Sequence, residues 1–174
     1  VTSLIAVGKD VYAVSDGRIS KVDFENKTLV KTALPSVRNA TSDGRFIATI
    51  PYGDNAIITY DSALNEKGTY GSKSAKDKWF DSPEKVFSEN GNVAVWDKSN
   101  ARVQFFFSDG TYKKLSVSKN ATSVAVNTTH TAYTDGKKVY VVNNADFSLR
   151  EINTDKNVGA ISLTNDAVAI YDKN

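Results

Sequence analysis

Short apolar bursts recur along this chain at intervals close to 40 residues, and this spacing constrains the fold more than any other feature. Within a burst, apolar residues alternate at period two, and Asp-Gly, Asn-Gly or Asn-Asn pairs stand between bursts. This pattern is typical of short strands joined by tight turns, because Gly, Asn and Asp tolerate the positive φ that such turns need. The clearest bursts are residues 11–14, 46–50, 93–96, 139–142 and 167–171. We therefore expect an all-β chain.

Two series of expected strands show the same repeat. The first has intervals of 35, 47, 38 and 36 residues and begins at Val11, Phe46, Val93, Thr131 and Ala167. The second has intervals of 38, 46 and 36 residues and begins at Ile19, Ile57, Val103 and Val139. Each series contains one long interval at the same place, so a single loop insertion explains both, and we assign it to residues 71–81.

A unit of about 40 residues with four short strands is typical of a β-propeller blade. One four-stranded sheet cannot bury both of its faces alone, and stacking such sheets around an axis covers them. We expect residues 1–174 to form a single β-propeller domain or a fragment of one. The expected antiparallel blades are 3–36, 37–72, 82–118 and 120–153, with a partial fifth blade at 157–174. A β-sandwich is the alternative, because irregular strands every ten residues or so would produce it too.

The expected fifth blade has only two strands within the sequence, at residues 158–163 and 167–171. Its third strand would begin near residue 175, just beyond Asn174. We therefore expect either a fragment of a larger propeller or a chain whose fifth blade is completed in a homo-oligomer or larger assembly.

One segment resembles a known repeat family. At residues 82–115 a strand is followed by Asn90-Gly91-Asn92, an apolar strand ending in Asp97, the motif Asn-X-Arg-Val at 100–103, and an Asp-Gly turn at 109–110. This segment is similar to an NHL-like or YVTN-like propeller blade, and the other units match more loosely. The resemblance implies propeller architecture. Because family members are mostly interaction platforms, it also implies a binding role, and it carries no active site.

Composition excludes several classes of protein. The chain has 22 basic and 20 acidic residues and a net charge of +2, whereas a nucleic-acid binder needs a basic surface to neutralise phosphates. It has no cysteine, which excludes disulfides, thiolate metal sites and cysteine nucleophiles. No stretch approaches the roughly 18 consecutive apolar residues of a membrane helix. We therefore expect neither nucleic-acid binding nor membrane insertion.

No motif in the sequence indicates catalysis. His130 is the only histidine, and no serine lies in a Gly-X-Ser-X-Gly elbow. Four aspartates precede glycine at expected turns, and a ring of such carboxylates would suit Ca²⁺, but an Asp-Gly turn needs no ion. These aspartates are Asp16, Asp43, Asp109 and Asp135. We expect no catalytic residue, no metal and no cofactor, and hence no enzyme.

The inserted loop holds the candidate binding residues. Adjacent aromatics beside cations in a loop favour recognition, since Trp supplies a large contact area at low entropy cost. The candidate partner-binding residues are Lys73, Lys76, Lys78, Trp79 and Phe80, with the lysines steering an acidic partner. The alternative is that both aromatics fold back over the edge of the third blade. Trp96 and the run 105–107 are expected in the core.

The function that follows is a non-catalytic binding scaffold with a protein or glycan partner. One alternative is a structural subunit of an extracellular or viral assembly, such as a virion or tail component, which the abundant Asn, Ser and Thr would suit. A weaker alternative is a propeller enzyme of the lyase or lactonase kind, which would need clustered carboxylates or histidines. An extracellular, cell-surface or virion location is favoured over a cytoplasmic one.

Overall fold

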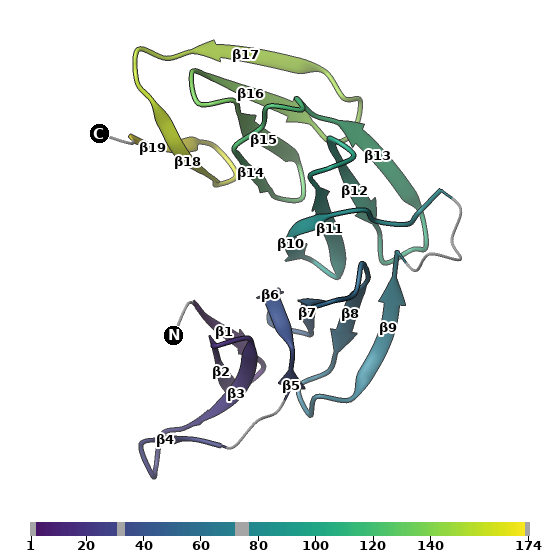
Figure 1. The fold of residues 1–174 in the computed structure, drawn as a ribbon, viewed down its shortest axis with the longest axis vertical. Coiled ribbons are helices and arrows are strands. Elements are labelled where there is room, and N and C mark those ends of the chain that lie inside the picture. The colour runs from purple at the N-terminus through teal and green to yellow at the C-terminus, as the bar shows by residue number, and fades with distance from the viewer. Residues whose placement is uncertain (1–2, 31–33, 72–76, 173–174) are drawn as a thin grey trace.

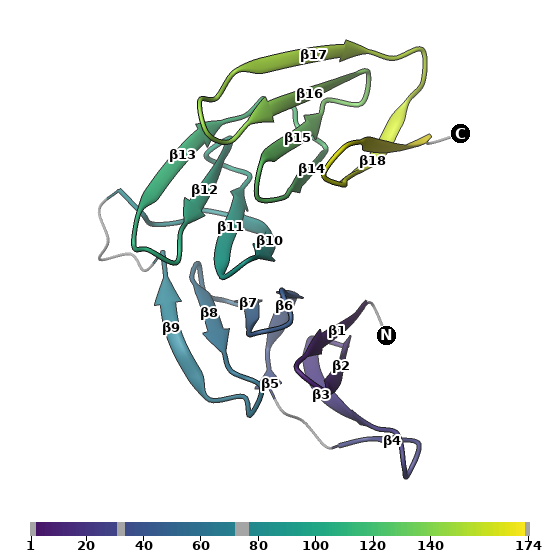
Figure 2. The same ribbon diagram turned by 180° about the vertical axis from the view of Figure 1, so that it is seen from behind.

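The structure is a computed structural model that describes residues 3–30, 34–71 and 77–172, and within these ranges the chain forms strands and turns without a helix. Consequently, no helix in these ranges has the length and apolarity to cross a bilayer. The strands form five successive antiparallel sheets that stack along an arc (Figures 1 and 2). We number the sheets 1 to 5 in chain order.

Sheet 1 contains β1 (Ser3–Val7), β2 (Asp10–Ser15), β3 (Arg18–Asp23) and β4 (Thr28–Leu29), with β5 (Leu34–Pro35) paired to β3. Sheet 2 contains β6 (Val37–Ser42), β7 (Ile47–Pro51), β8 (Ile57–Tyr60) and β9 (Glu66–Tyr70). Sheet 3 contains β10 (Pro83–Glu89), β11 (Asn92–Asp97), β12 (Arg102–Phe106) and β13 (Tyr112–Ser116). Sheet 4 contains β14 (Ser123–Val126), β15 (His130–Thr134), β16 (Lys138–Asn143) and β17 (Leu149–Asn153). Sheet 5 contains β18 (Val158–Leu163) and β19 (Val168–Asp172).

Strand order in sheets 2, 3 and 4 follows the chain, so each sheet is a meander. The first strand of each sheet lies on the concave side of the arc, and the fourth strand of sheets 2 to 4 lies on the convex side (Figure 1). Tight turns make the meander possible. Asp16 and Gly17 between β2 and β3 both have positive φ, at 49° and 71°, as do Asn90 and Gly91 between β10 and β11, at 52° and 82°. Positive φ at both central residues matches the right-handed twist of the strands that the turn joins.

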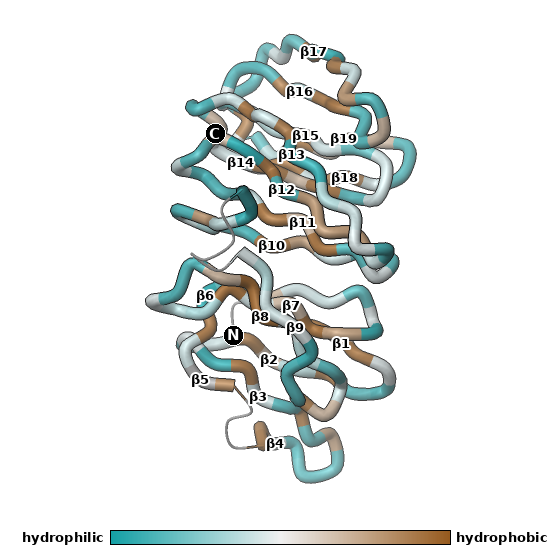
Figure 3. The backbone as a smooth tube through the Cα atoms, turned by 90° about the vertical axis from the view of Figure 1, so that its right-hand side faces the viewer, coloured by the Kyte–Doolittle hydropathy of each residue, from teal (hydrophilic) through white to brown (hydrophobic). Residues whose placement is uncertain are grey.

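The core lies between the sheets, and neighbouring residues of one strand contribute to different parts of it. On β11, Val93 and Val95 pack toward sheet 2, while Ala94 and Trp96 pack toward sheet 4. This alternation explains why the strands read as continuous apolar runs, since both faces of each inner sheet are covered. Figure 3 shows hydrophobic positions along the strands and hydrophilic positions at many of the turns.

The aromatic run on β12 obeys the same rule. Phe106 packs between sheets 2 and 3, whereas Phe105 and Phe107 face sheet 4 and their rings lie 6.1 Å apart. Trp96 is 4% exposed, which confirms its predicted burial. The repeated four-stranded antiparallel sheets confirm the predicted all-β propeller architecture, and the alternative of a two-sheet sandwich does not describe five sheets in an arc.

Candidate functional site

The predicted binding loop leads from the convex strand β9 to the concave strand β10 (Figure 1). Two of its candidate residues, Lys73 and Lys76, lie outside the described residues. Lys78 is exposed and Trp79 is 36% exposed, whereas Phe80 is completely buried. The structure therefore divides the two adjacent aromatics between the surface and the core.

Phe80 belongs to the core between sheets 2 and 3. It clusters there with Ile50 and Ile57 of sheet 2 and with Val86 of sheet 3, and its ring meets that of Phe106 edge-on at 5.9 Å. The alternative interpretation, in which both aromatics fold back onto the propeller, therefore holds for Phe80 but not for the exposed Trp79. The loop is fastened to the core immediately beside the exposed Trp79.

A buried carboxylate fixes the end of the loop. Asp97, the last residue of β11, has no exposed surface, and its Oδ1 accepts the backbone N–H groups of Asp81 at 3.1 Å and Ser82 at 3.0 Å. Its Oδ2 accepts Asn100 Nδ2 at 2.8 Å and pairs with the Arg102 guanidinium at 3.1 Å. Burying a carboxylate is costly unless its lone pairs are satisfied in this way. The turn after β11 and the loop before β10 are therefore held by one side chain.

The backbone carbonyl of Trp79 is held as well. It accepts Arg102 Nη2 at 2.6 Å and Nε2 of the fully buried Gln104 at 3.1 Å. The Gln104 side-chain carbonyl in turn accepts the Tyr112 hydroxyl, which also lies 2.9 Å from the Asp77 carbonyl. Burial raises the pKa of Tyr112 above 10.0, which keeps this hydroxyl protonated as a donor. Side chains of β12 and β13 thus fix the loop backbone at two points.

Aromatic rings and cations meet where the exposed part of the loop lies beside β12 and β13. The Arg102 guanidinium carbon lies 6.0 Å from the centre of the Trp79 ring, and the ammonium groups of Lys78 and Lys114 lie 5.0 and 5.9 Å from the centre of the Tyr112 ring. Such distances fall within the range of cation–π attraction. We call these five residues the Trp79 platform. It offers flat rings and positive charge to solvent on a backbone that is already fixed.

Asp97, Arg102, Gln104 and Tyr112 were not among the candidate residues drawn from the sequence. The sequence did hold a signal for two of them, because Asp97 ends the apolar run of β11 and Gln104 interrupts that of β12, and such side chains need hydrogen-bond partners when buried. Their partner is the backbone of a loop that lies 15 to 25 residues earlier in the chain, and the same pattern does not predict this partner.

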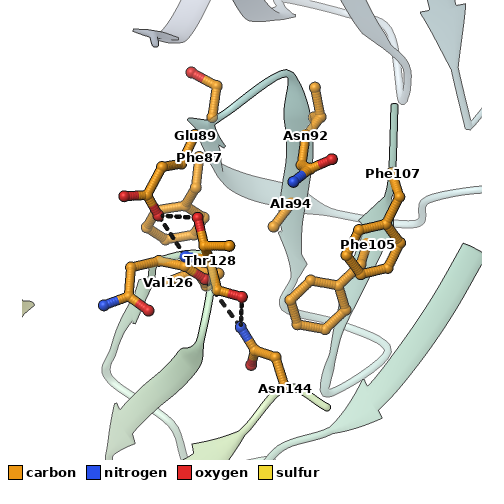
Figure 4. Close-up of a pocket in the computed structure, with 12 residues that line it drawn as sticks. Phe87, Glu89, Asn92, Ala94, Phe105, Phe107, Val126, Thr128 and Asn144 are labelled. Carbon is orange, nitrogen blue, oxygen red and sulfur yellow. Dashed lines mark hydrogen bonds between the residues drawn. The ribbon is translucent and has the colours of Figure 1, made fainter. Parts of the chain in front are cut away.

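A small pocket lies between sheets 3 and 4, and Figure 4 shows it. Aromatic rings of Phe87, Phe105 and Phe107 form part of its lining. At its rim, a Glu89 carboxylate oxygen accepts the Thr128 backbone N–H and, at 2.7 Å, the Thr128 hydroxyl. The pocket volume is about 30 Å³, which is room for about two water molecules and not for a substrate. Its rim contacts fasten sheet 4 to sheet 3.

His130, the first residue of β15, is half-buried. Its backbone N–H donates to Asn127 Oδ1 at 2.7 Å, and its ring Nδ1 lies 2.9 Å from the Thr129 hydroxyl. It borders a hollow of about 450 Å³ whose lining includes Ser148 and Asp166, and the contact that the structure gives its ring is with Thr129. Over the ranges that the structure describes, no three His, Asp or Glu side chains gather closely enough to hold a metal ion.

The aspartates of three Asp-Gly turns bind their own backbone. The Oδ1 atoms of Asp43, Asp109 and Asp135 accept the N–H groups of the residues two positions later, at 2.9, 2.8 and 3.0 Å. Hydrogen bonds to Thr111 lower the pKa of Asp109, and backbone hydrogen bonds from Lys137 and Lys138 lower that of Asp135. These carboxylates therefore act as turn caps.

Compared by sequence, the chain matches no protein-family model and no curated protein. Compared by structure, it is similar to Hsv2 of Kluyveromyces marxianus, with a TM-score of 0.70 and 13% identity over 95% of this chain and 54% of that one. It is also similar to virginiamycin B lyase from Staphylococcus aureus, with a TM-score of 0.67 and 13% identity over 96% of this chain and 61% of that one.

A third similar structure comes from a nidogen/laminin complex, with a TM-score of 0.66 and 13% identity over 97% of this chain and 70% of that one. The first structures it matches are longer, and the chain spans 54%, 62% and 53% of their lengths. They include a lyase alongside proteins whose names state no enzymatic activity, so the likeness concerns the fold alone. By its repeated antiparallel sheets and by this likeness, the chain has β-propeller architecture.

Proposed function

We propose that this chain is a non-catalytic binding scaffold that recognises an acidic protein or glycan partner through the Trp79 platform. One observation carries the proposal. Arg102 and Gln104 hold the backbone carbonyl of Trp79 in place, while the Trp79 side chain remains 36% exposed. An exposed aromatic on a fixed backbone loses little entropy when a partner covers it, which favours recognition.

Each residue of the predicted loop has a role in this proposal. Trp79 provides the contact area, and Lys78, together with Lys73 and Lys76, provides positive charge that steers an acidic partner. Phe80 is the anchor, because its burial between sheets 2 and 3 holds the loop against the propeller. Binding therefore depends on the core as well as on the surface.

The non-catalytic part of the proposal is supported by how the candidate catalytic groups are engaged. The His130 ring contacts the Thr129 hydroxyl, and the turn aspartates accept hydrogen bonds from their own backbone. Similarity to a lyase at 13% identity concerns the fold and carries no catalytic residue to this chain.

The test is a binding screen with matched variants. The chain is applied to arrays of acidic and neutral oligosaccharides and to acidic and neutral peptides, and bound ligands are titrated against Trp79→Ala and Trp79→Phe. We expect acidic ligands to be retained, with at least a tenfold weaker affinity in Trp79→Ala and a smaller loss in Trp79→Phe. Tyr171→Ala is the control, since Tyr171 is 67% exposed on sheet 5, away from the platform.

Two outcomes would contradict the proposal. One is a ligand that binds wild type and Trp79→Ala equally well. The other is a stable homo-oligomer, seen by sedimentation without any partner, whose formation is unaffected by Trp79→Ala. That second result would favour a structural subunit.

A further inference from the structure

A hollow of about 260 Å³ opens on the concave side of the arc, among the first strands of sheets 2 to 5. These strands are β6, β10, β14 and β18, and Figure 1 shows them facing the inside of the arc. Lys85 is the one charged residue among those that line the hollow. The hollow is separate from the Trp79 platform, which lies on β12, β13 and the loop before β10.

Lys85 has no acidic partner. Within the described ranges, its ammonium makes no ion pair, and its contact is with the ring of Phe87, whose centre lies 5.2 Å away. The two carboxylates of its own strand are engaged elsewhere: Glu84 pairs with Lys98 at 3.7 Å, and Glu89 accepts from Thr128. A cation in a concave site without a counter-charge attracts anions.

Two side chains with hydrogen-bond donors that have no partner in the described part of the chain line the same hollow as Lys85. Asn39 on β6 uses its Oδ1 to accept the Val86 N–H at 3.1 Å, and among the described residues its Nδ2 has no acceptor, so it can donate to a ligand in the hollow. The Ser162 hydroxyl on β18 also lines the hollow and has no hydrogen bond within the described part of the chain.

Apart from Thr41, whose hydroxyl accepts the Ser88 hydroxyl, the rest of the lining is apolar. Ala40, Ala125, Val126 and Leu163 border the hollow together with Phe87. An occupant therefore needs one anionic group and a modest apolar part. The single positive charge of Lys85 can neutralise a monoanion, but it neutralises only one of the two negative charges of a dianion such as phosphate.

We propose that the hollow binds a small monocarboxylate, with its carboxylate at Lys85 Nζ and Asn39 Nδ2 and its apolar part against Phe87 and Leu163. Protein atoms around the Lys85 ammonium displace part of its hydration and lower the pKa of Lys85 below 10.5, although the side chain stays open to the hollow. A partly dehydrated ammonium gains more from an anion than a fully hydrated one does. By linkage, binding of a carboxylate raises the pKa of Lys85 again.

The experiment uses NMR of the chain carrying ¹³Cε-labelled lysine, titrated at constant ionic strength with sodium benzoate, neutral benzamide or inorganic phosphate. The Lys85 resonance is assigned by its disappearance in Lys85→Gln. We expect a saturable shift of this resonance with benzoate, a weaker response to phosphate and none to benzamide. Saturation-transfer signals from benzoate should show at least tenfold weaker binding in Lys85→Gln, near-normal binding in Lys85→Arg, and no change in Lys119→Gln, which alters an exposed lysine outside both sites.

Several outcomes would overturn the proposal: no saturable response of Lys85 to benzoate, an equal response to benzamide, or tighter binding of phosphate than of benzoate. Near-normal binding in Lys85→Arg shows that the charge at position 85 is what benzoate needs, and unchanged resonances of the other lysines in Lys85→Gln show that its loss of binding does not reflect misfolding. Trp79→Ala should leave benzoate binding unchanged, so a failure of this proposal can be told apart from a failure of the proposed binding by the Trp79 platform.

Discussion

The ring of Phe80 lies over the backbone of Gly71, in the space that a β-carbon on Gly71 would need. Gly71 directly follows β9 and has a φ of +77°, a conformation that residues with a β-carbon adopt at a cost. The glycine thus allows both the turn out of sheet 2 and the close approach of the ring. The beginning and the end of the inserted loop are joined through this contact, which closes the core between sheets 2 and 3.

Gly71→Ala should destabilise the protein through both effects. The positive φ costs about 1 kcal/mol for a non-glycine residue, and displacing the Phe80 ring adds roughly 1–3 kcal/mol of overpacking. Urea denaturation measures the loss. Gly53→Ala is the matched control, because Gly53 has a φ of +76° and no atom within 4 Å of its would-be β-carbon. Equal losses in the two variants would show that the Phe80 contact contributes nothing.

Removing the buried carboxylate of Asp97 should be among the most damaging single changes. Asp97→Ala removes the carboxylate that pairs with the Arg102 guanidinium, and it leaves the N–H groups of Asp81 and Ser82 without their acceptor. Breaking a buried ion pair in this way costs about 3–5 kcal/mol. The measurements are urea denaturation and amide hydrogen exchange at residues 77–82, where exchange should accelerate.

The control for Asp97→Ala is Asp109→Ala, which removes an exposed carboxylate that caps a turn through the Thr111 N–H. That variant should lose only about 1 kcal/mol, because the two hydrogen bonds that Asp109 accepts from Thr111 are exposed to water, which can replace them. If Asp97→Ala were no more destabilising than this, Asp97 would not be what holds the loop.

Alternation along single strands was predictable from the sequence, because it is a local property. The burial of Phe106 on one face of β12 and of Phe105 and Phe107 on the other follows from the period of a strand. The different fates of Trp79 and Phe80 could not be predicted in this way. The two are adjacent aromatics in a polar loop, and only the position of Phe106 on another strand decides which of them is buried.

Both candidate sites are likewise formed by residues that lie far apart in the sequence. Asp97 and Gln104 could be recognised as polar residues in apolar strands, but their partner is the backbone of the loop before β10. The hollow at Lys85 exists because the inner strands of four sheets surround a space, and no segment of the sequence describes a space between sheets. Local pattern therefore predicts strands and repeats, and tertiary arrangement determines the sites.

The two tryptophans should respond very differently to truncation. Trp96 is 4% exposed and belongs to the core between sheets 3 and 4, so Trp96→Ala should lose about 3–5 kcal/mol of stability. Trp79 is 36% exposed, and Trp79→Ala should lose about 1 kcal/mol or less while weakening partner binding. Urea denaturation followed by circular dichroism compares them without relying on tryptophan emission. A loss below about 1 kcal/mol for Trp96→Ala would contradict its place in the core.

Alkaline pH should destabilise the protein, and Tyr12 should contribute. Tyr12 is 1% exposed, its hydroxyl donates to the Ser62 carbonyl at 2.6 Å, and burial raises its pKa above 10.0. The unfolded chain then ionises first, so this contribution to stability is complete below about pH 10 and is lost as pH rises through the folded-state pKa.

In urea denaturation between about pH 8 and pH 11, Tyr12→Phe should be less stable than wild type at pH 8, by about 1 kcal/mol for the lost hydrogen bond. It should also lose less stability as the pH rises, because one ionising group has been removed. Burial likewise raises the pKa of Tyr60, Tyr112 and Tyr133, so part of the pH dependence remains in the variant. Tyr171→Phe, which alters an exposed ring, is the control. If Tyr12→Phe kept the full wild-type slope, ionisation of the buried Tyr12 hydroxyl would not be a cause of the alkaline loss.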